Sequence, residues 1–313
     1  MVNELKEGQS FRGALFGVAQ AEVRQARNGG PFLYLRLSDR TATVEARQFE
    51  RADLPGGVAP GEVVRITGSY TSGYGIRIEH VERYTGQVNF EDFLPPCPKD
   101  IAQMDQEIKG ILATIQDPWL PKLVRQFQAD AWEDFQRWPG AKEVHHAYVG
   151  GLLEHTLAVV RLLDTYSGLY KVNRDLMLVG GLFHDIGKLE ELGCKATVLF
   201  TDAGNLFGHT YLGAKRLERY AASVEGFPAV LQDHLRHMVL SHHGNLEWGA
   251  VITPMTLESF FLHIADYTDT RAYRYDAIAK QQREKGLVVG QKDRFLDTRV
   301  YSPEQETNGA GDA

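Results

Sequence analysis

The chain has 313 residues, of which 43% are hydrophobic and 24% charged, as in a globular protein with room for two domains. No apolar run reaches the roughly 20 residues that a membrane-spanning helix needs, and the first residues lack the pattern of a secretory signal. The net charge of −7 argues against broad electrostatic binding to nucleic acid. The two cysteines, Cys97 and Cys194, form neither a CxxC motif nor a disulfide framework, so we expect a cytoplasmic protein with no membrane partner.

Residues 1–86 carry a strand-like pattern. In segment 32–37, leucines alternate with aromatic and basic residues, which is the period of a half-buried strand. Segments 43–49 and 63–70 have the same character, and glycine-rich turns separate the segments. Five short strands of this kind predict a small all-β barrel of the OB type.

An OB barrel binds single strands by stacking bases on exposed aromatic side chains. We expect Phe32, Tyr34 and Arg47 to contact such a strand. Two alternatives stay open, because Phe32 or Tyr34 could instead fill the barrel, and the barrel could serve as an assembly module. Charge does not decide between them, since residues 1–90 hold eleven basic and ten acidic residues, a net charge of about +1.

The pattern changes after the barrel. Segment 87–100 is proline-rich and aperiodic, and we interpret it as a linker. Residues 101–300 predict an all-α domain, with Asn173 as one N-cap and Thr253-Pro254 opening another helix. Residues 301–313 are small and polar and predict a disordered tail. The expected helical runs lie at 101–115, 152–163, 176–186, 206–220, 230–240 and 256–278.

Ten of the eleven histidines lie after residue 144, and several stand beside aspartates within apolar helices. A helical bundle builds metal sites from polar side chains that project inward from facing helices. Imidazole with carboxylate suits Mn, Fe, Ni, Co or Zn, and two such ions can hold a phosphoryl group and activate water. A single histidine at the end of a helix is more often a cap than a ligand. It is improbable, however, that five apolar helices would each carry a histidine or aspartate by chance. The candidates are His155, His184, Asp185, His209, His242, His243 and Asp266.

Basic residues near these candidates suggest substrate contacts. Lys188 lies four residues past His184 and could hold a phosphate oxygen, or only complement the end of a helix. Lys142 and His146 could contact substrate, or His145-His146 could simply begin a helix. The other histidines are interpreted as structural: His80, His234, His237 and His263.

These motifs resemble a known family. His155, His184-Asp185 and Asp266 are similar to the H…HD…D signature of the HD-domain phosphohydrolases, and residues 184–188 read HDIGK. The OB-like barrel, the linker at 92–100 and segment 141–156 resemble more narrowly the YhaM-type 3′–5′ exoribonucleases.

The resemblance implies a ligand set. One ion would be held by His155, His184, Asp185 and Asp266. A second would share Asp185 and take His209 and His242, with His243 as the alternate ligand or a substrate contact.

We therefore expect a metal-dependent phosphodiesterase that degrades single-stranded RNA, and DNA as a second substrate, from the 3′ end by attack of a metal-activated hydroxide. Asp185 and Lys188 would be catalytic, and two divalent ions, with Mn²⁺ first, would be the cofactors. One alternative is an HD-type hydrolase of a nucleotide, an alarmone or a cyclic dinucleotide. Another is a nucleic-acid-binding regulatory protein with a structural metal site. Homo-oligomer formation is left open.

Overall fold

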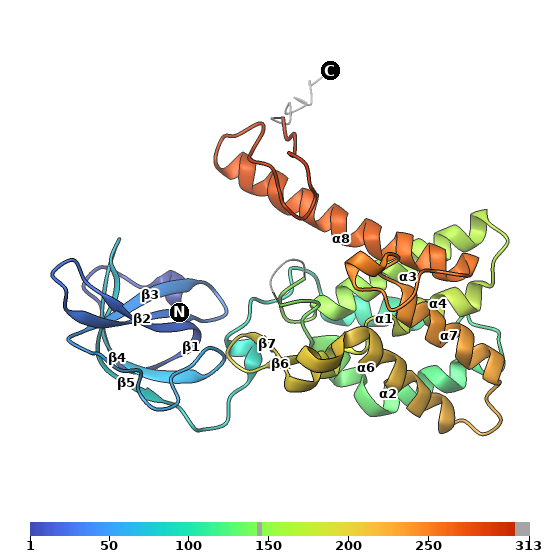
Figure 1. The fold of residues 1–313 in the computed structure, drawn as a ribbon, viewed down its shortest axis with the longest axis horizontal. Helices are drawn as coiled ribbons and strands as arrows, with labels where there is room; N and C mark the ends of the chain where they lie inside the picture. The colour runs from blue at the N-terminus through green and yellow to red at the C-terminus, as the bar shows by residue number, and fades with distance from the viewer. Residues whose placement is uncertain (143–145, 304–313) are drawn as a thin grey trace, which may run out of the picture.

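The computed structural model describes residues 1–142 and 146–303. A β-barrel and a helical domain lie side by side, and a long helix rises from the helical domain toward the C-terminus (Figure 1). Both predicted fold classes are confirmed. Throughout the described ranges, every helix is too short or too polar to span a bilayer.

The barrel closes in the order β1-β2-β3-β5-β4. All neighbours are antiparallel except β3 and β5, which pair parallel. Alternating strand directions cannot close around an odd number of strands, so one parallel pair is unavoidable. The strands are β1 (Ser10–Gln25), β2 (Pro31–Ser38), β3 (Thr43–Phe49), β4 (Val63–Thr71) and β5 (Gly75–Arg83).

The alternation along β2 fixes which face of the strand points outward. Leu33, Leu35 and Leu37 are fully buried in the barrel core. Successive side chains of a strand point to opposite faces, so Phe32 and Tyr34 lie on the outer face. Neither ring belongs to the barrel core, but only Phe32 is partly exposed. Tyr34 is 5% exposed beneath Arg24, so the structure does not offer it as a contact for a strand.

The segment expected to be a linker packs against both domains. After the short turn η2 (Phe90–Asp92), Phe93 and Leu94 are both buried. Phe93 packs with Val63 of the barrel and Ala196 of the helical domain. Residues 87–100 thus fill the joint between the two domains instead of spanning open solvent.

The helical domain matches most of the expected runs. Asn173 caps α4 by accepting a hydrogen bond from the Leu176 amide. Thr256, not the Thr253-Pro254 pair, caps α8, because its hydroxyl accepts from the Ser259 amide. The helices are α1 (Ile101–Leu112), α2 (Leu120–Arg137), α3 (Gly151–Leu169), α4 (Arg174–Phe183), α5 (Lys188–Glu191), α6 (Asp202–Ala222), α7 (Ala229–Ser241) and α8 (Leu257–Glu284).

A small hairpin interrupts the helical domain and was not expected. Its strands, β6 (Leu192–Cys194) and β7 (Val198–Phe200), pair between α5 and α6. The tip of the hairpin docks on the barrel, where the Ala196 amide donates to the Gly61 carbonyl (3.3 Å). Gly17 lies so close that an added Cβ would stand 2.8 Å from the Ala196 Cβ. The hairpin therefore joins the barrel to the helical domain.

The C-terminal segment folds back along α8 (Figure 1). Tyr301 forms a bridge with Val289, and the Ser302 amide donates to the Val288 carbonyl (2.8 Å). Residues 301–303 of the predicted disordered tail, 301–313, are therefore ordered, and residues 304–313 lie outside the described part of the chain.

Candidate metal centre

The predicted ligands converge from five helices. His155 lies on α3, His184 and Asp185 follow α4, and His209 lies on α6. The His242-His243 pair ends α7, and Asp266 lies on α8. His155, His184, Asp185 and His242 are each no more than 2% exposed. Buried polar groups of this kind are costly unless they are paired, so their meeting at one point indicates a site.

A first group of donors meets around His155. Its Nε2 lies 3.1 Å from His184 Nε2, 3.4 Å from Asp185 Oδ2 and 3.2 Å from Asp266 Oδ1. Donors that share a transition ion at about 2.1 Å stand about 3.0–3.4 Å apart. These four residues therefore fit one ion.

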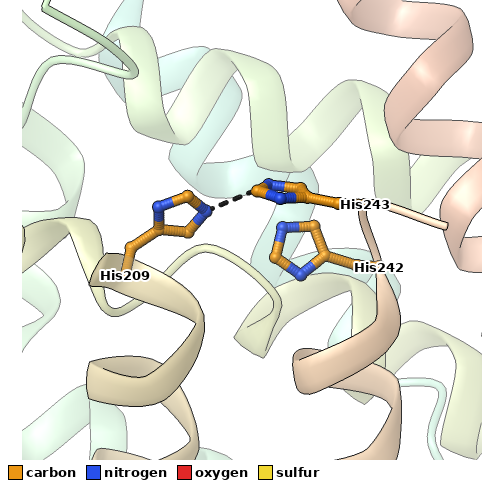
Figure 2. A group of neighbouring side chains, drawn as sticks. All are labelled: His209, His242 and His243. Carbon is orange, nitrogen blue, oxygen red and sulfur yellow. Dashed lines mark hydrogen bonds between the residues drawn. The ribbon is translucent and has the colours of Figure 1, made fainter. Parts of the chain in front are cut away.

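A second group lies beside the first. His209 faces the His242-His243 pair across the gap between α6 and α7 (Figure 2). His209 Nε2 lies 3.2 Å from His243 Nε2 and 3.4 Å from Asp185 Oδ1. His242 Nε2 lies 3.7 Å from the same Asp185 oxygen. Either His242 or His243 could therefore contact an ion held beside His209.

Asp185 stands between the two groups. Its Oδ2 faces His155 and His184, while its Oδ1 faces His209 and His242. A carboxylate with one oxygen toward each group can bridge two ions about 3.5–4 Å apart.

Two glycines allow this close approach of helices. A Cβ added at Gly187, just after Asp185, would lie 2.0 Å from the His209 carbonyl oxygen. Gly208 has φ of 68°, a left-handed conformation that breaks the regular path of α6 directly before His209. The glycine of the HDIGK sequence therefore lets α6 carry His209 to Asp185.

Backbone carbonyls orient two of the histidines. His184 Nδ1 donates to the Gly181 carbonyl and His242 Nδ1 to the Val239 carbonyl, each at 2.7 Å. A proton held on Nδ1 leaves the Nε2 lone pair free, which is the form that binds a metal.

Carboxylates orient the other two. His155 Nδ1 donates to Asp269 Oδ2 (2.7 Å), and His209 Nδ1 donates to Glu191 Oε1 (3.0 Å). Such outer partners fix the ring and increase the basicity of the nitrogen that faces the metal.

The surroundings of Asp185 and His242 shift their pKa values in the direction that favours metal binding. Burial would raise the pKa of Asp185, but the charges of Lys188 and His184 hold it well below its usual range. Burial, followed by neighbouring His243, lowers the pKa of His242. An anionic Asp185 and a neutral His242 are the forms that coordinate a cation.

Sequence reasoning missed Asp269 and Glu191. Burial would lower the pKa of His155, but hydrogen bonds to Asp266 and Asp269 raise it to about 10, so this pocket attracts positive charge. Asp269 lies three residues after Asp266, one helical turn along α8, and that spacing was the available signal.

His146 does not lie where a substrate contact was expected. It is 3% exposed and its Nε2 lies 3.1 Å from Asp269 Oδ2, behind His155. His146 therefore belongs with the residues that support His155. Neighbouring His145 lies outside the described residues.

Other predicted contacts do line a cavity of about 510 Å³ above the metal ligands. Lys188 lies at its floor, with Nζ 2.6 Å from Asp185 Oδ2. Lys142 lies at its rim, with Nζ 5.6 Å from the Phe200 ring centroid. His263, expected to be structural, also reaches the cavity, and its Nδ1 donates to the His242 carbonyl (2.9 Å).

The predicted strand contacts lie on the barrel, apart from the cavity. Phe32 packs against Phe49 in a tilted arrangement with ring centroids 5.8 Å apart, and Phe49 is 41% exposed. Tyr34 is covered, because Arg24 lies 3.5 Å from its ring centroid. Arg47 lies 5.0 Å from the Tyr74 ring centroid.

Comparisons with known proteins agree with this geometry. The HD domain family model matches residues 152–271, which include the converging ligands. The 3′–5′ exoribonuclease YhaM of Bacillus subtilis (strain 168) is 30% identical over 259 residues, covering 80% of this chain and 82% of the relative. The protein of the same name from Listeria monocytogenes serotype 4b is 29% identical over 279 residues, covering 86% and 88%. A solved structure, the second OB-fold domain of replication protein A from Methanococcus maripaludis, matches at 20% identity with a TM-score of 0.23, covering 28% of this chain and 97% of that domain.

Proposed function

We propose that this chain, which belongs to the YhaM family of 3′–5′ exoribonucleases, removes nucleotides from the 3′ end of single-stranded RNA. Its HD domain makes it a metal-dependent phosphohydrolase. The observation that carries the proposal is Asp185, whose two oxygens face two separate groups of histidines at the floor of a nucleotide-sized cavity.

The donor set supports two divalent transition ions. His155, His184, Asp185 and Asp266 would hold the first. Asp185, His209 and His242, with His243 within reach, would hold the second. Imidazole and carboxylate donors without thiolate favour Mn²⁺, with Fe, Ni, Co or Zn as alternatives. When bound, such ions supply Lewis acidity and lower the pKa of water.

Hydrolysis would join a water oxygen to the phosphorus and break its bond to the 3′ oxygen of the preceding nucleotide. The products are a nucleoside 5′-monophosphate and a strand one nucleotide shorter with a free 3′-hydroxyl. Lys188 faces the cavity beside Asp185 and would bind a phosphate oxygen, where its charge offsets the charge that develops on phosphorus. Lys142, Arg271 and Arg294 also line the cavity and would hold the sugar–phosphate chain.

The barrel, residues 1–86, would grip the strand and would not take part in the chemistry. The outward position of Phe32 beside exposed Phe49 supports a stacking surface. The hairpin supports a fixed path between the barrel and residues 101–300, because its tip docks on the barrel and Phe200 at its other end lines the cavity.

We also propose a cellular location and a second substrate for this protein, and we consider its oligomeric state. We place the protein in the cytoplasm, where RNA is available and both cysteines stay free, as they are here. DNA is proposed as a second substrate, because stacking on aromatic rings does not depend on the 2′-hydroxyl. Homo-oligomers are compatible with this function and are not required by it.

A direct test uses purified full-length protein, Mn²⁺ and single-stranded RNA of one sequence, labelled at the 5′ end in its linear form and at an internal phosphate in its circular form. The linear RNA should shorten stepwise from its 3′ end, the circle should stay intact, and EDTA should stop the reaction. Cyclic dinucleotides and an alarmone are tested in parallel. Rapid hydrolysis of either, with linear RNA unchanged, would contradict the proposal.

A further inference from the structure

One wall of the cavity above the metal ligands is aromatic. Trp248 and Tyr267 stack with ring centroids 5.7 Å apart and an interplanar angle of 17°. Both rings line the cavity, and they are 51% and 37% exposed. Large aromatic side chains are usually far more buried, so a half-exposed stacked pair in a cavity is a candidate binding surface.

The position of Tyr267 follows from the period of α8. His263, Tyr267 and Arg271 recur every four residues and share one side of the helix. The opposite side buries Phe261 and Leu262 in the domain core. Tyr267 is therefore directed to the cavity and does not contribute to the core.

The position of Trp248 is tied to the metal ligands by the loop after α7. The loop turns through Gly244 and Gly249, whose φ values are 76° and 95°. A Cβ added at Gly244 would lie 2.3 Å from the His263 ring. Asn245 accepts from the Glu247 amide and thereby begins the short helix η3 (Leu246–Trp248). These constraints place the indole beside the end of α7, where His242 and His243 lie.

The far end of the stack is basic. Arg271 lies 4.5 Å from the Tyr267 ring centroid and 5.3 Å from that of Phe295. Its Nε is buried and meets no acceptor among residues 1–142 and 146–303. Tyr267 is thus contacted by both Trp248 and Arg271, and Trp248, the more exposed ring, offers the open aromatic face.

We propose that Trp248, backed by Tyr267, stacks on the base of the 3′-terminal nucleotide and positions its phosphate over the metal centre. This inference rests on the proposed function, since it assigns a base to a cavity where an RNA end is cleaved. A cavity of about 510 Å³ lies within the range of about 300–1,000 Å³ for small-ligand sites, so it has room for one nucleotide. Every base has a π-face, so stacking requires a base without selecting which one.

The test pairs enzyme variants with RNA ends. Two RNAs are compared that differ only in the 3′-terminal residue, which is either a normal nucleotide or an abasic one. Wild-type protein should release the first residue at least about 10-fold faster from the normal end, because a stacked base contributes substantially to binding. Trp248→Ala should lose this preference, and Trp248→Phe should retain part of it. The matched control is Leu246→Ala, which changes a 60%-exposed side chain of the same short helix that does not line the cavity.

A second readout does not depend on hydrolysis. Adenosine 5′-monophosphate should bind the wild-type protein at least about 10-fold more tightly than ribose 5-phosphate, and this ratio should fall toward 1 in Trp248→Ala but not in Leu246→Ala. Metal content measured in each variant shows that the centre is intact. Equal rates on both RNA ends together with equal affinities for the two ligands would overturn the inference, while cleavage from the 3′ end would still uphold the proposed function. Preferential binding of the adenosine ligand through Trp248 would support the base site even if RNA were not cleaved.

Discussion

The barrel carries its polar and aromatic groups on its outer surface, whereas the helical domain holds ionisable side chains in its interior. The barrel core is apolar, and its aromatic and basic groups lie outside, as Phe49 and Arg47 do. The helical domain holds ionisable side chains such as Asp185 and His184 within its interior. Buried charges are tolerated only with partners, whereas exposed contacts each contribute little. Substitutions of the buried ionisable residues at the centre of the helical domain should therefore have the largest effects on function, and those on the outer face of the barrel should only weaken it.

The largest effect is expected at the residue between the two groups of histidines. Asp185→Asn keeps the shape of the side chain and removes its charge, so hydrolysis should fall below detection and bound metal should be lost. Helical circular dichroism should stay near that of wild type. Asp276→Asn, an exposed position on the same domain, is the control and should stay active. Full activity in a metal-free Asp185→Asn protein would contradict the expectation that the helical domain, and not the barrel, carries the chemistry.

A smaller effect is expected at Asp269, which accepts a hydrogen bond from the predicted metal ligand His155. Asp269→Asn leaves His155 in place and weakens its Nδ1 partner, which should reduce metal affinity or activity about 10- to 100-fold. Excess Mn²⁺ should restore part of the rate, a response that a general loss of folding would not give. A rate unchanged at limiting metal concentration would show that Asp269 does not position His155.

The barrel should affect binding and not the chemical step. Phe32→Ala removes an outward ring beside Phe49 and should raise KM for long RNA by about 5-fold or more, with hydrolysis of a small phosphodiester unchanged. Tyr34→Ala should do less, because Arg24 already covers that ring. Leu54→Ala, an exposed barrel position between β3 and β4, serves as control. Equal KM changes on both substrates would contradict a strand-binding role.

The smallest effect is expected for an ion pair between the hairpin and the barrel. Lys195 pairs with Glu62 across the domains, and both side chains are partly exposed. Such a pair is worth about 0–1 kcal/mol, so Lys195→Ala should change RNA hydrolysis by less than about 5-fold. A larger loss, specific to long RNA, would mean that the joint does more than hold the barrel in place.

The sequence predicted those parts of the molecule in which a regular hydrophobic period, or metal-ligating residues within apolar helices, could be seen. The barrel followed from the alternation at 32–37, and the ligand candidates followed from histidines and aspartates within apolar helices. The outer partners were not predicted, because Asp269 and Glu191 gain their roles only when α8 and α5 pack against His155 and His209; the spacing of Asp269 from Asp266 was the one available signal.

Two elements were missed for different reasons. The three-residue strands of the hairpin are too short for any period to appear, and pairing across the turn is what forms them. The apolar residues of α2 do recur at helical spacing, but Pro118 and Pro121 obscured its start. Pro121 is the second residue of α2, and proline is tolerated in the first helical turn, where no amide partner is lost.

Elemental analysis of protein purified without chelator would show whether the ligands around Asp185 hold two ions. Native protein should contain about two transition-metal ions per chain. His209→Ala should contain about one, because the first group, around His155, is left intact. A content of one ion in both proteins, with equal activity on RNA, would contradict a centre for two ions.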